Sequence, residues 1–423
     1  MEDGLREDGA ELKLAEAALG NIAFLRHRVA GLEHRSGSDW DIAVRDEQGV
    51  GWIVESLFGK PLISVPKQFV VQRYFEWGQI DLLPCFEWQG ITYLSPDRFW
   101  SRVSVHEDGL PRPCISHDAF IVWMTGLLWG GRYSDRYDEL ILRALDEEEK
   151  EFSECLMEAF GGRLGRKMLS YAESGKAGSA VSLVGHMRTT LWMRSIGRGN
   201  STISRQVSHW GIEVRHHIRT PFPWIAVLGP DGSGKSTMIE GLKERLARSR
   251  ISIVQTHWWP EPRKPGEVSG PPVVDPHGQK PRGFLLSVAK TVWLWVRWWR
   301  ARLGPVGHVL SKRSMLISDR YFDDLAVDPK RYRFGGPMCF AKLLFRFAPR
   351  PDRVVILVGD AKEIHARKQE VSMNELKRQL VQYRELAEKL GGRAQLVDSS
   401  RAVDQVQRDF WAAVFPGADK GPN

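Results

Sequence analysis

The sequence predicts an α/β protein whose C-terminal half, residues 216–423, forms a three-layer α/β/α domain with a parallel sheet. The main observation is an apolar segment at 225–228, which is followed by a glycine-rich loop and then by an amphipathic helical segment. Short apolar segments nearer the N-terminus have the length and composition of paired strands and predict an α+β domain over 1–110. A long helical pattern between them predicts a helical extension and connector over 111–215.

The composition is that of a folded globular chain. The 423 residues exceed what one hydrophobic core usually organises, and contents of 42% hydrophobic and 26% charged residues argue against a disordered or fibrous class. The net charge of +8 favours anionic partners. The 4 cysteines are scattered without a CxxC pair, and the N-terminus lacks the apolar stretch of a signal peptide. We therefore expect reduced thiols and a cytoplasmic protein.

The expected elements follow from apolar spacing and from turn residues. In the N-terminal half they are a helix and short strand within 11–35, strands at 42–44, 69–74 and 79–83, helices within 117–160, a small polar linker at 170–180 and a basic connecting helix within 190–217. In the C-terminal half they are strands at 225–228, 315–319 and 353–358, a helix at 238–249 and a later helix that contains Arg378 and Arg384.

The loop after the 225–228 strand has the pattern G-x-x-x-x-G-K-S. Glycines let the backbone wrap around a phosphate, while the N–H groups of the loop and of the following helix face the anion. In this pattern the lysine reaches the β- and γ-phosphates and the serine hydroxyl binds Mg²⁺. The sequence therefore predicts an ATP-Mg²⁺ site, with contacts from Gly229, Asp231, Gly232, Ser233, Gly234, Lys235, Ser236 and Thr237.

One lysine is not enough for phosphoryl transfer. A lysine about 4 Å from a phosphate charge gains roughly 4 kcal/mol at an effective dielectric of about 20, whereas the reaction needs at least ~8 kcal/mol of barrier lowering. Asp319 and Arg320 end an apolar strand, where a carboxylate suits a Mg²⁺ ligand or base and a guanidinium suits an acceptor phosphate. A second Asp-Arg-Tyr at 135–137 lies in a charged helical stretch and is interpreted as surface.

Further cations follow in the chain. Arg367 and Lys368 occur where a lid would close over the γ-phosphate, and they complete the expected catalytic set with Lys235, Asp319 and Arg320. Arg378 and Arg384 are interpreted as a solvated helix face. Two interpretations stay open for Lys330, Arg331 and Arg333, which either hold an anionic acceptor or form the charged face of a turn.

The segments GPDGSGKST, SDRY and RKQE, in this order, resemble the thymidylate kinase-like branch of P-loop kinases. The resemblance implies transfer of the γ-phosphate of ATP-Mg²⁺ to a small anionic or hydroxyl-bearing acceptor, a nucleoside monophosphate or a sugar-like metabolite. It assigns Asp231 to the acceptor, Asp319 to the metal-bound water or the base role, and Arg320 to the acceptor phosphate. The chain departs from thymidylate kinases at 322–337 and in an insertion at 256–282. It looks closer to family members of uncharacterised substrate that carry an extra N-terminal domain.

The N-terminal domain contains a possible second metal site. Asp39 and Asp41 lie two residues apart at the start of a strand, and Asp81 on a second strand offers a third carboxylate. Together they resemble the polymerase-β-type nucleotidyltransferase fold over 15–110, which implies a divalent metal on these three residues. The Gly37-Ser38 pair adjoins the carboxylates instead of starting an upstream helix. Active nucleotidyl transfer and a binding relic both remain open.

The partners expected are ATP and a small acceptor, with no nucleic acid because no binding module is recognisable. The tryptophans between 293 and 299 are interpreted as core or partner packing rather than as a membrane contact, and the 284–296 segment is too short to span a bilayer. A homodimer is one option for the assembly. Three functions are therefore weighed: a phosphotransferase, a bifunctional kinase and nucleotidyltransferase, and a non-catalytic nucleotide-sensing module.

Overall fold

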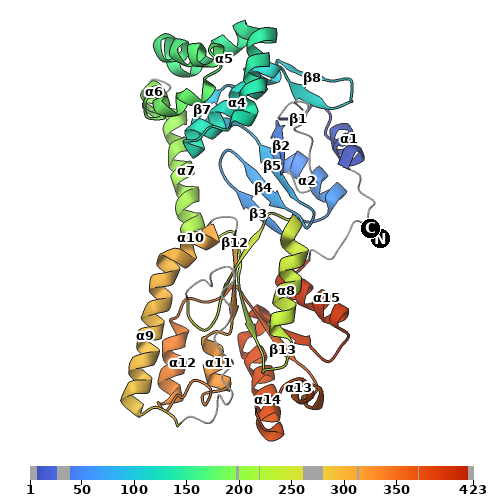
Figure 1. The fold of residues 1–423 in the computed structure, drawn as a ribbon, viewed down its shortest axis with the longest axis vertical. Helices are drawn as coiled ribbons and strands as arrows, with labels where there is room; N and C mark the ends of the chain where they lie inside the picture. Colours follow the sequence, from blue (N-terminus) through green and yellow to red (C-terminus); the bar gives the residue numbers. More distant parts are fainter. Residues whose placement is uncertain are drawn as a thin grey trace. The chain divides into compact units, whose positions relative to one another are not determined.

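The chain divides into two compact units, residues 1–215 and 216–419, and each has its own sheet (Figure 1). The structure, a computed structural model, describes residues 7–25, 39–196, 200–218, 220–260, 280–311, 314–369 and 371–417. Each unit is described by itself.

The first unit begins with a mixed five-stranded sheet in the order β1-β2-β5-β4-β3. Its strands are β1 (Ile22–Phe24), β2 (Asp39–Val44), β3 (Ile63–Pro66), β4 (Val71–Tyr74) and β5 (Gln79–Leu83). The strands β2 and β5 are parallel, and β4 pairs antiparallel with β5, which confirms the predicted pairing of the 69–74 and 79–83 segments. Helices α1 (Glu7–Ala17) and α2 (Glu47–Phe58) contribute to a shared core with this sheet. The Asp46 side chain caps α2 by accepting a hydrogen bond from the Gln48 N–H.

The rest of this unit is mainly helical. It begins with two hairpins and a short helix: β6 (Phe86–Trp88) with β7 (Ile91–Leu94), α3 (Pro96–Trp100), and β8 (Val103–Val105) with β9 (Pro111–Pro113). The helices that follow are α4 (Ile115–Thr125), the π-helix η1 (Gly126–Gly130), the 3₁₀ turn η2 (Asp135–Tyr137), α5 (Asp138–Glu173), the 3₁₀ helix η3 (Ala177–Leu183), α6 (Val184–Ile196) and α7 (Asn200–Ile218). The predicted helices within 117–160 are confirmed. Asp135 and Arg136 are exposed, as expected for the second Asp-Arg-Tyr.

The predicted linker at 170–180 is wrong. Ala172, Ala177 and Ala180 are buried in the same core as α4 and α5. The side chains of this segment are small because η3 packs closely against α5. Gly175 forms the turn between the two helices with a φ of 65°. Small and polar residues therefore mark a tight helical corner here rather than a break between domains.

The second unit contains a five-stranded parallel sheet in the order β11-β12-β10-β13-β14. Its strands are β10 (Trp224–Leu228), β11 (Ser252–Thr256), β12 (Ser314–Asp319), β13 (Arg353–Val358) and β14 (Ala394–Asp398). The central strand β10 is buried along its whole length, as parallel strands covered on both faces require. The predicted α/β class with a parallel sheet is confirmed.

Helices cover both faces of this sheet (Figure 1). Trp224, Ala226 and Leu228 belong to a core with residues of α9 and α14, while the alternate residues Ile225 and Val227 are buried on the other face. The helices are α8 (Lys235–Arg245), α9 (Phe284–Leu303), α10 (Pro305–Ser311), α11 (Phe322–Val327), α12 (Met338–Arg346), α13 (Ala361–Arg367), α14 (Met373–Leu390) and α15 (Val403–Val414), with the 3₁₀ turns η4 (Leu246–Arg248) and η5 (Gly391–Arg393).

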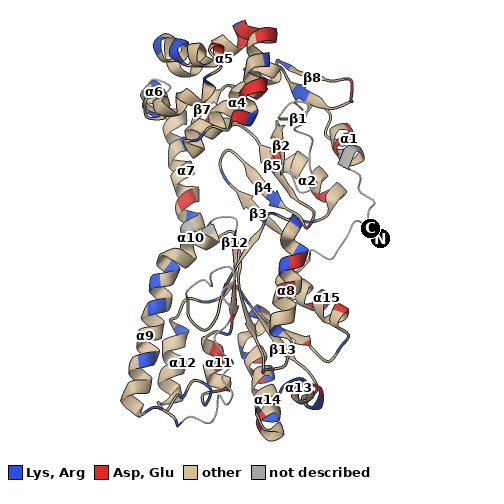
Figure 2. Cartoon of the chain, viewed as in Figure 1, with Lys and Arg blue, Asp and Glu red and all other residues tan. Residues whose placement is uncertain are grey.

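Helix α9 contains the tryptophan-rich segment. Trp298 is 1% exposed and stacks on Trp224 with ring centroids 5.0 Å apart, whereas Trp293 is 49% exposed. The same helix also contains Lys and Arg residues (Figure 2), of which Arg300 is exposed and Lys290, Arg297 and Arg302 are half-buried. Core packing therefore explains Trp298 but not Trp293. Among the described residues, no helix combines the length and apolar composition needed to cross a membrane.

The Trp298→Ala variant should lose about 3–5 kcal/mol of unfolding free energy in the second unit, because its ring fills space against β10. Hydrogen exchange of the β10 and β12 amides measures this loss for the unit itself. The matched control on the same helix, Trp293→Ala, should lose less than about 1 kcal/mol. Equal losses in the two variants would contradict the core assignment.

Candidate functional site

The glycine-rich loop, residues 229–234, connects the C-terminal end of β10 to the N-terminus of α8. Its three glycines all have positive φ angles, of 143°, 83° and 87°. A Cβ on Gly229 would lie 2.6 Å from the Leu357 carbonyl oxygen, and one on Gly232 would lie 2.9 Å from the Ile364 carbonyl oxygen. Glycine is required at both positions, because a side chain would clash with neighbouring backbone and strain its own. The strand, loop and helix have the order from which the sequence predicts a phosphate cradle.

Lys235 is the first residue of α8 and is 8% exposed. Its Nζ donates hydrogen bonds to the carbonyl oxygens of Gly229 and Pro230, each at 2.8 Å. Burial lowers the pKa of Lys235 to about 8 and Arg320 adds to this effect, while the Asp231 carboxylate opposes it. The ammonium group is therefore largely removed from water and is held mainly by neutral oxygens, so an anion beside it is strongly favoured.

Arg320 lies between two carboxylates. Its Nη2 donates to Asp231 Oδ1 and its Nη1 to Asp324 Oδ2, each at 2.5 Å, and Arg331 also binds Asp231. The Arg320 side chain is almost fully buried, which disfavours its charge, but the Asp324 and Asp231 carboxylates outweigh burial and hold its pKa well above the ordinary value. Its backbone has a φ of 78°, and its N–H donates to the Val227 carbonyl oxygen at 3.0 Å. Both ends of the residue are therefore fixed to the loop region.

Asp324 anchors this arrangement from α11. Its carboxylate is 0% exposed and accepts hydrogen bonds from Arg320, from the Tyr332 hydroxyl at 2.6 Å and from the Tyr383 hydroxyl. Burial acts to raise the pKa of Asp324, but the Arg320 guanidinium and the two hydroxyls hold it below the ordinary value. The charged carboxylate is fully satisfied, so Arg320 cannot rotate away without leaving a buried charge unpaired.

Two polar atoms at the loop lack such partners. Asp319 is the last residue of β12, and among the described residues its Oδ1 is buried without a hydrogen-bond partner. The Ser233 hydroxyl in the loop is also buried without a hydrogen-bond partner among the described residues. Ser236 and Thr237 are exposed in the first turn of α8. Buried polar atoms without protein partners are uncommon in native structures, and an oxygen set of this kind fits a hard cation such as Mg²⁺ and its water ligands.

The two expected lid residues have different surroundings. The Lys368 Cβ lies 3.1 Å from the position of a Cβ on Gly232, which brings this lysine directly against the loop. Arg367 instead donates through Nη1 to the Ser399 carbonyl oxygen at 3.0 Å and lies 3.8 Å from Glu363. Of the five expected catalytic residues, Lys235, Asp319, Arg320 and Lys368 therefore gather at the loop, and Arg367 turns toward the end of β14.

A narrow recess lies beside the loop. Its volume of about 10 Å³ has room for a single water molecule. The Gln379 amide donates to Asp328 Oδ2 at 3.1 Å at its margin. The lining residues are Pro230, Asp231, Arg320, Asp328, Arg331, Lys368, Val371, Leu376 and Gln379.

Sequence reasoning missed Asp324 and left Arg331 undecided. No helical spacing marks Asp324: it follows Arg320 by four residues, but Arg320 precedes α11 and has a left-handed backbone. Arg331 binds Asp231 in the loop, whereas Lys330 is exposed and Arg333 donates to the Lys280 carbonyl oxygen. Arg378, expected on a solvated face, is half-buried and binds Glu375 and the Val327 carbonyl oxygen, while Arg384 is exposed as expected.

In the first unit, the parallel register of β2 and β5 pairs Asp41 with Asp81 and Asp39 with Gln79. Because alternate residues of a strand face the same side, the backbone brings Asp39, Asp41 and Asp81 to one face of the sheet. Asp81 is buried, and its carboxylate accepts hydrogen bonds from the Gln79 amide at 2.5 Å and the Gln72 amide at 3.2 Å. The Asp39 side chain and the Gly37-Ser38 pair lie outside the described residues.

Another group in this unit has the residue types of a metal site. His117, Glu151 and Cys155 have ligand atoms within 4.8 Å of one another. However, Arg98 donates to Glu151 Oε1 at 2.7 Å, and burial raises the pKa of the Cys155 thiol to about 12. A guanidinium on the carboxylate and a protonated thiol disfavour a cation, so we interpret the group as a buried polar network.

No protein-family model and no curated protein matches this chain. The chemistry of the site therefore rests on its own residues.

The Asp324→Asn variant should lose about 3–5 kcal/mol of unfolding free energy at neutral pH, because it leaves Arg320 buried without one of its carboxylates. Since the pKa of Asp324 is lowered in the folded protein, its contribution is complete above pH ~4 and is lost as the pH falls through the folded value. The difference from the wild type should therefore shrink in acid.

Hydrogen exchange of the β12 amides at several pH values measures this difference. The control is Asp404→Asn, which breaks an exposed i,i+4 pair with Arg408 and should cost less than ~0.5 kcal/mol. A loss for Asp324→Asn that does not depend on pH would contradict the assigned charge.

Proposed function

We propose that the second unit is a P-loop kinase domain with a three-layer α/β/α fold. It transfers the γ-phosphate of ATP-Mg²⁺ to a small acceptor, either a nucleoside monophosphate or a sugar-like metabolite. The observation that carries this proposal is the meeting of a buried lysine, a glycine loop and two arginines that share the loop's own carboxylate. Phosphoryl transfer depends on positioning and on cations around the transferred group, and these residues supply both.

On the nucleotide side, the N–H groups of the loop and of the α8 N-terminus bind phosphate oxygens. Lys235 exchanges its carbonyl acceptors for β- and γ-phosphate oxygens, which are charged and therefore stronger acceptors. The Ser236 hydroxyl, and Asp319 through water, would hold the magnesium ion, which neutralises phosphate charge when bound. The buried Asp319 oxygen, which has no hydrogen-bond partner among the described residues, supports this role.

On the acceptor side, Arg320 and Arg331 bind the anionic group of the acceptor in place of the Asp231 carboxylate. Asp231 is then released to accept a hydrogen bond from an acceptor hydroxyl. Because the recess holds about one water, the acceptor enters only when the segment around Lys368 moves away. Lys368 returns with the acceptor bound and faces the γ-phosphate from the lid side. Exclusion of water in this closed state favours transfer over hydrolysis.

In the transfer step, an acceptor oxygen forms a bond to the γ-phosphorus while the bond from that phosphorus to the bridging oxygen breaks. ADP leaves with the electron pair. When the attacking group is a hydroxyl, its proton passes to the Asp319 carboxylate. When it is a phosphate oxygen, no proton transfer is required.

A second candidate function is a bifunctional enzyme in which the first unit transfers nucleotidyl groups. The observation that favours it is the β2/β5 register, which brings Asp39, Asp41 and Asp81 to one face of the sheet. Three carboxylates in this arrangement suit two divalent ions around a triphosphate. The amides that bind Asp81 would have to share it with such an ion.

In the Lys235→Ala variant the rate of acceptor-stimulated ADP release should fall by at least about 100-fold, because the variant lacks the positive charge that stabilises the transferring phosphate. ADP and pyrophosphate are measured separately across a panel of nucleotides and sugars. The matched control, Lys243→Ala, alters a half-buried lysine of the same helix that pairs with Glu240 away from the loop and should stay within about twofold.

Each alternative has its own outcome in this assay. Pyrophosphate release that is lost in Asp39→Asn supports the bifunctional enzyme. ATP binding without ADP release for any acceptor would replace the kinase with a nucleotide-sensing module. Failure to bind any purine nucleotide would refute the nucleotide site itself.

The Arg331→Ala variant should raise the KM for the acceptor by about tenfold or more, because a charge-assisted hydrogen bond contributes about 1.5–3 kcal/mol. The KM for ATP should change by less than about twofold, since Arg331 is assigned to the acceptor side. Steady-state kinetics with each substrate varied in turn give both constants. Arg384→Ala, on an exposed position of α14, is the control. A rise in the KM for ATP alone would assign Arg331 to the nucleotide.

A further inference from the structure

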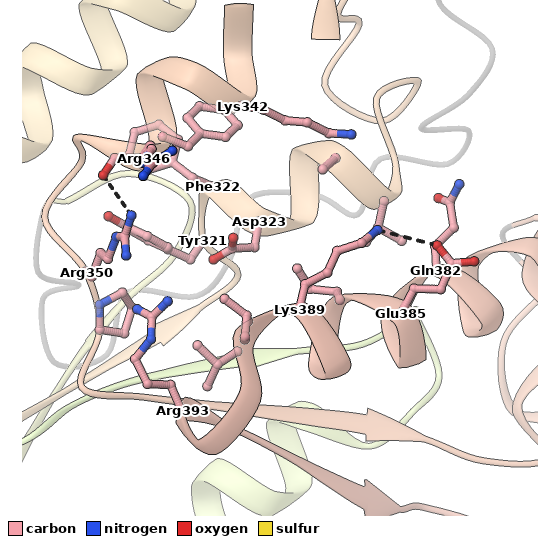
Figure 3. Close-up of a pocket in the computed structure, with 17 residues that line it drawn as sticks. Tyr321, Phe322, Asp323, Lys342, Arg346, Arg350, Gln382, Glu385, Lys389 and Arg393 are labelled. Carbon is pink, nitrogen blue, oxygen red and sulfur yellow. Dashed lines mark hydrogen bonds and ion pairs between the residues drawn. The ribbon is translucent and has the colours of Figure 1, made fainter. Parts of the chain in front are cut away.

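A second cavity lies in the same unit between α11, α12 and α14, and none of the residues that line the recess lines it (Figure 3). Its volume of about 720 Å³ is within the usual range for small-molecule sites, about 300–1,000 Å³. It reaches the N-terminal end of β13, at Val354, whereas the glycine loop follows the C-terminal end of β10. Since β10 and β13 are parallel, this part of the cavity lies toward the opposite end of the sheet from the loop.

One part of the wall is apolar and aromatic. Phe322 and Phe345 face each other across α11 and α12 with ring centroids 4.5 Å apart. Other apolar residues of the wall include Val327, Val354, Leu386 and Leu390. Phe322, Val327 and Val354 are already buried, whereas Phe345, Leu386 and Leu390 are partly exposed and gain free energy when an apolar group covers them.

The remaining wall is strongly basic. Five cationic side chains line the cavity against only two carboxylates, Asp323 and Glu385. Lys389 lies 3.6 Å from Glu385, and Arg350 donates to the Arg346 carbonyl oxygen at 2.8 Å. Within the part of the chain that the structure describes, the charged groups of Lys342, Arg346 and Arg393 have no hydrogen bond or ion pair. The cavity therefore has an excess of positive charge that the protein does not neutralise.

Asp323 lies at the centre of this wall and points between the two groups of basic side chains (Figure 3). Among the described residues, no other side chain donates a hydrogen bond to its carboxylate. Burial raises its pKa, while Arg393 and Arg350 oppose the shift. A half-buried carboxyl group of this kind can exchange a hydrogen bond with a hydroxyl or amino group of a ligand.

We propose that this cavity is a second binding site, separate from the glycine loop, for an organic anion that joins a phosphate, sulfonate or carboxylate group to an apolar ring. The anionic group binds Arg346 and Arg393, and the ring lies against the partly exposed Phe345, Leu386 and Leu390. Inorganic phosphate satisfies only the first requirement and binds weakly, because it leaves Phe345, Leu386 and Leu390 in contact with water. This proposal does not depend on kinase activity.

The test uses the full-length protein and 1-anilinonaphthalene-8-sulfonate, an aromatic sulfonate whose fluorescence rises on binding. Titration at fixed ionic strength should show one saturable site. Arg393→Ala and Arg346→Ala should each weaken binding by about tenfold, since each removes one charge-assisted contact. The matched control Arg384→Ala removes an exposed arginine of α14 that does not line the cavity and should change binding by less than about twofold.

Two further arms distinguish binding in this cavity from binding at the glycine loop and from simple attraction to positive charge. Lys235→Ala should leave the affinity for the dye unchanged, and loss of binding in this variant would place the dye at the glycine loop and overturn the proposal. Inorganic phosphate should displace the dye only at concentrations at least ~100-fold above those of the dye itself. Equal potency of phosphate, or equal affinity in all arginine variants, would also overturn it. Near-UV circular dichroism of each variant verifies that it is folded.

Discussion

The buried pairing of Arg320 with two carboxylates is the interaction on which the rest of the second unit depends. A guanidinium in a dry interior costs several kcal/mol unless its partners are well placed, and here they come from the glycine loop, at Asp231, and from α11, at Asp324. The pairing therefore ties the glycine loop to the segment where β12 leads into α11, 89 residues further along the chain. It also explains why Arg320 keeps a left-handed backbone conformation, which costs about 1 kcal/mol or more for a residue other than glycine.

The same pairing makes the loop a prepared surface rather than a flexible one. Lys235 is held by loop carbonyls and Asp231 by two arginines, so each charged group already has an oriented but replaceable partner. Charged side chains that are already oriented need not be ordered when the ligand binds. The free-energy cost of that ordering, which weakens binding at other polar sites, is therefore reduced. In the proposed kinase, the loop and the acceptor clamp would be coupled through the one carboxylate that they share.

Local patterns made part of this structure predictable. The apolar runs of β10, β12 and β13 indicated strands of a parallel sheet, because such strands are buried on both faces, and the G-x-x-x-x-G-K-S pattern marked the loop between β10 and α8. Asp324 could not be recognised in the same way, since its role depends on the hydroxyl of Tyr383, which is 59 residues away. The segment at 170–180 was misread because small residues serve both in linkers and in close helix packing. The roles of Asp319, Lys368 and the carboxylates of β2 and β5 remain predictions.

Helix α11 places Asp323 against the large cavity and Asp324 against Arg320, although the two residues are adjacent. Neighbouring side chains of an α-helix point in directions about 100° apart. Asp323 and Asp324 therefore both reach their sites only at one rotation of the helix about its own axis. Inserting or deleting one residue between β12 and α11 would turn both carboxylates away from their sites together. This stretch, Arg320 and Tyr321, should therefore not tolerate a change in length.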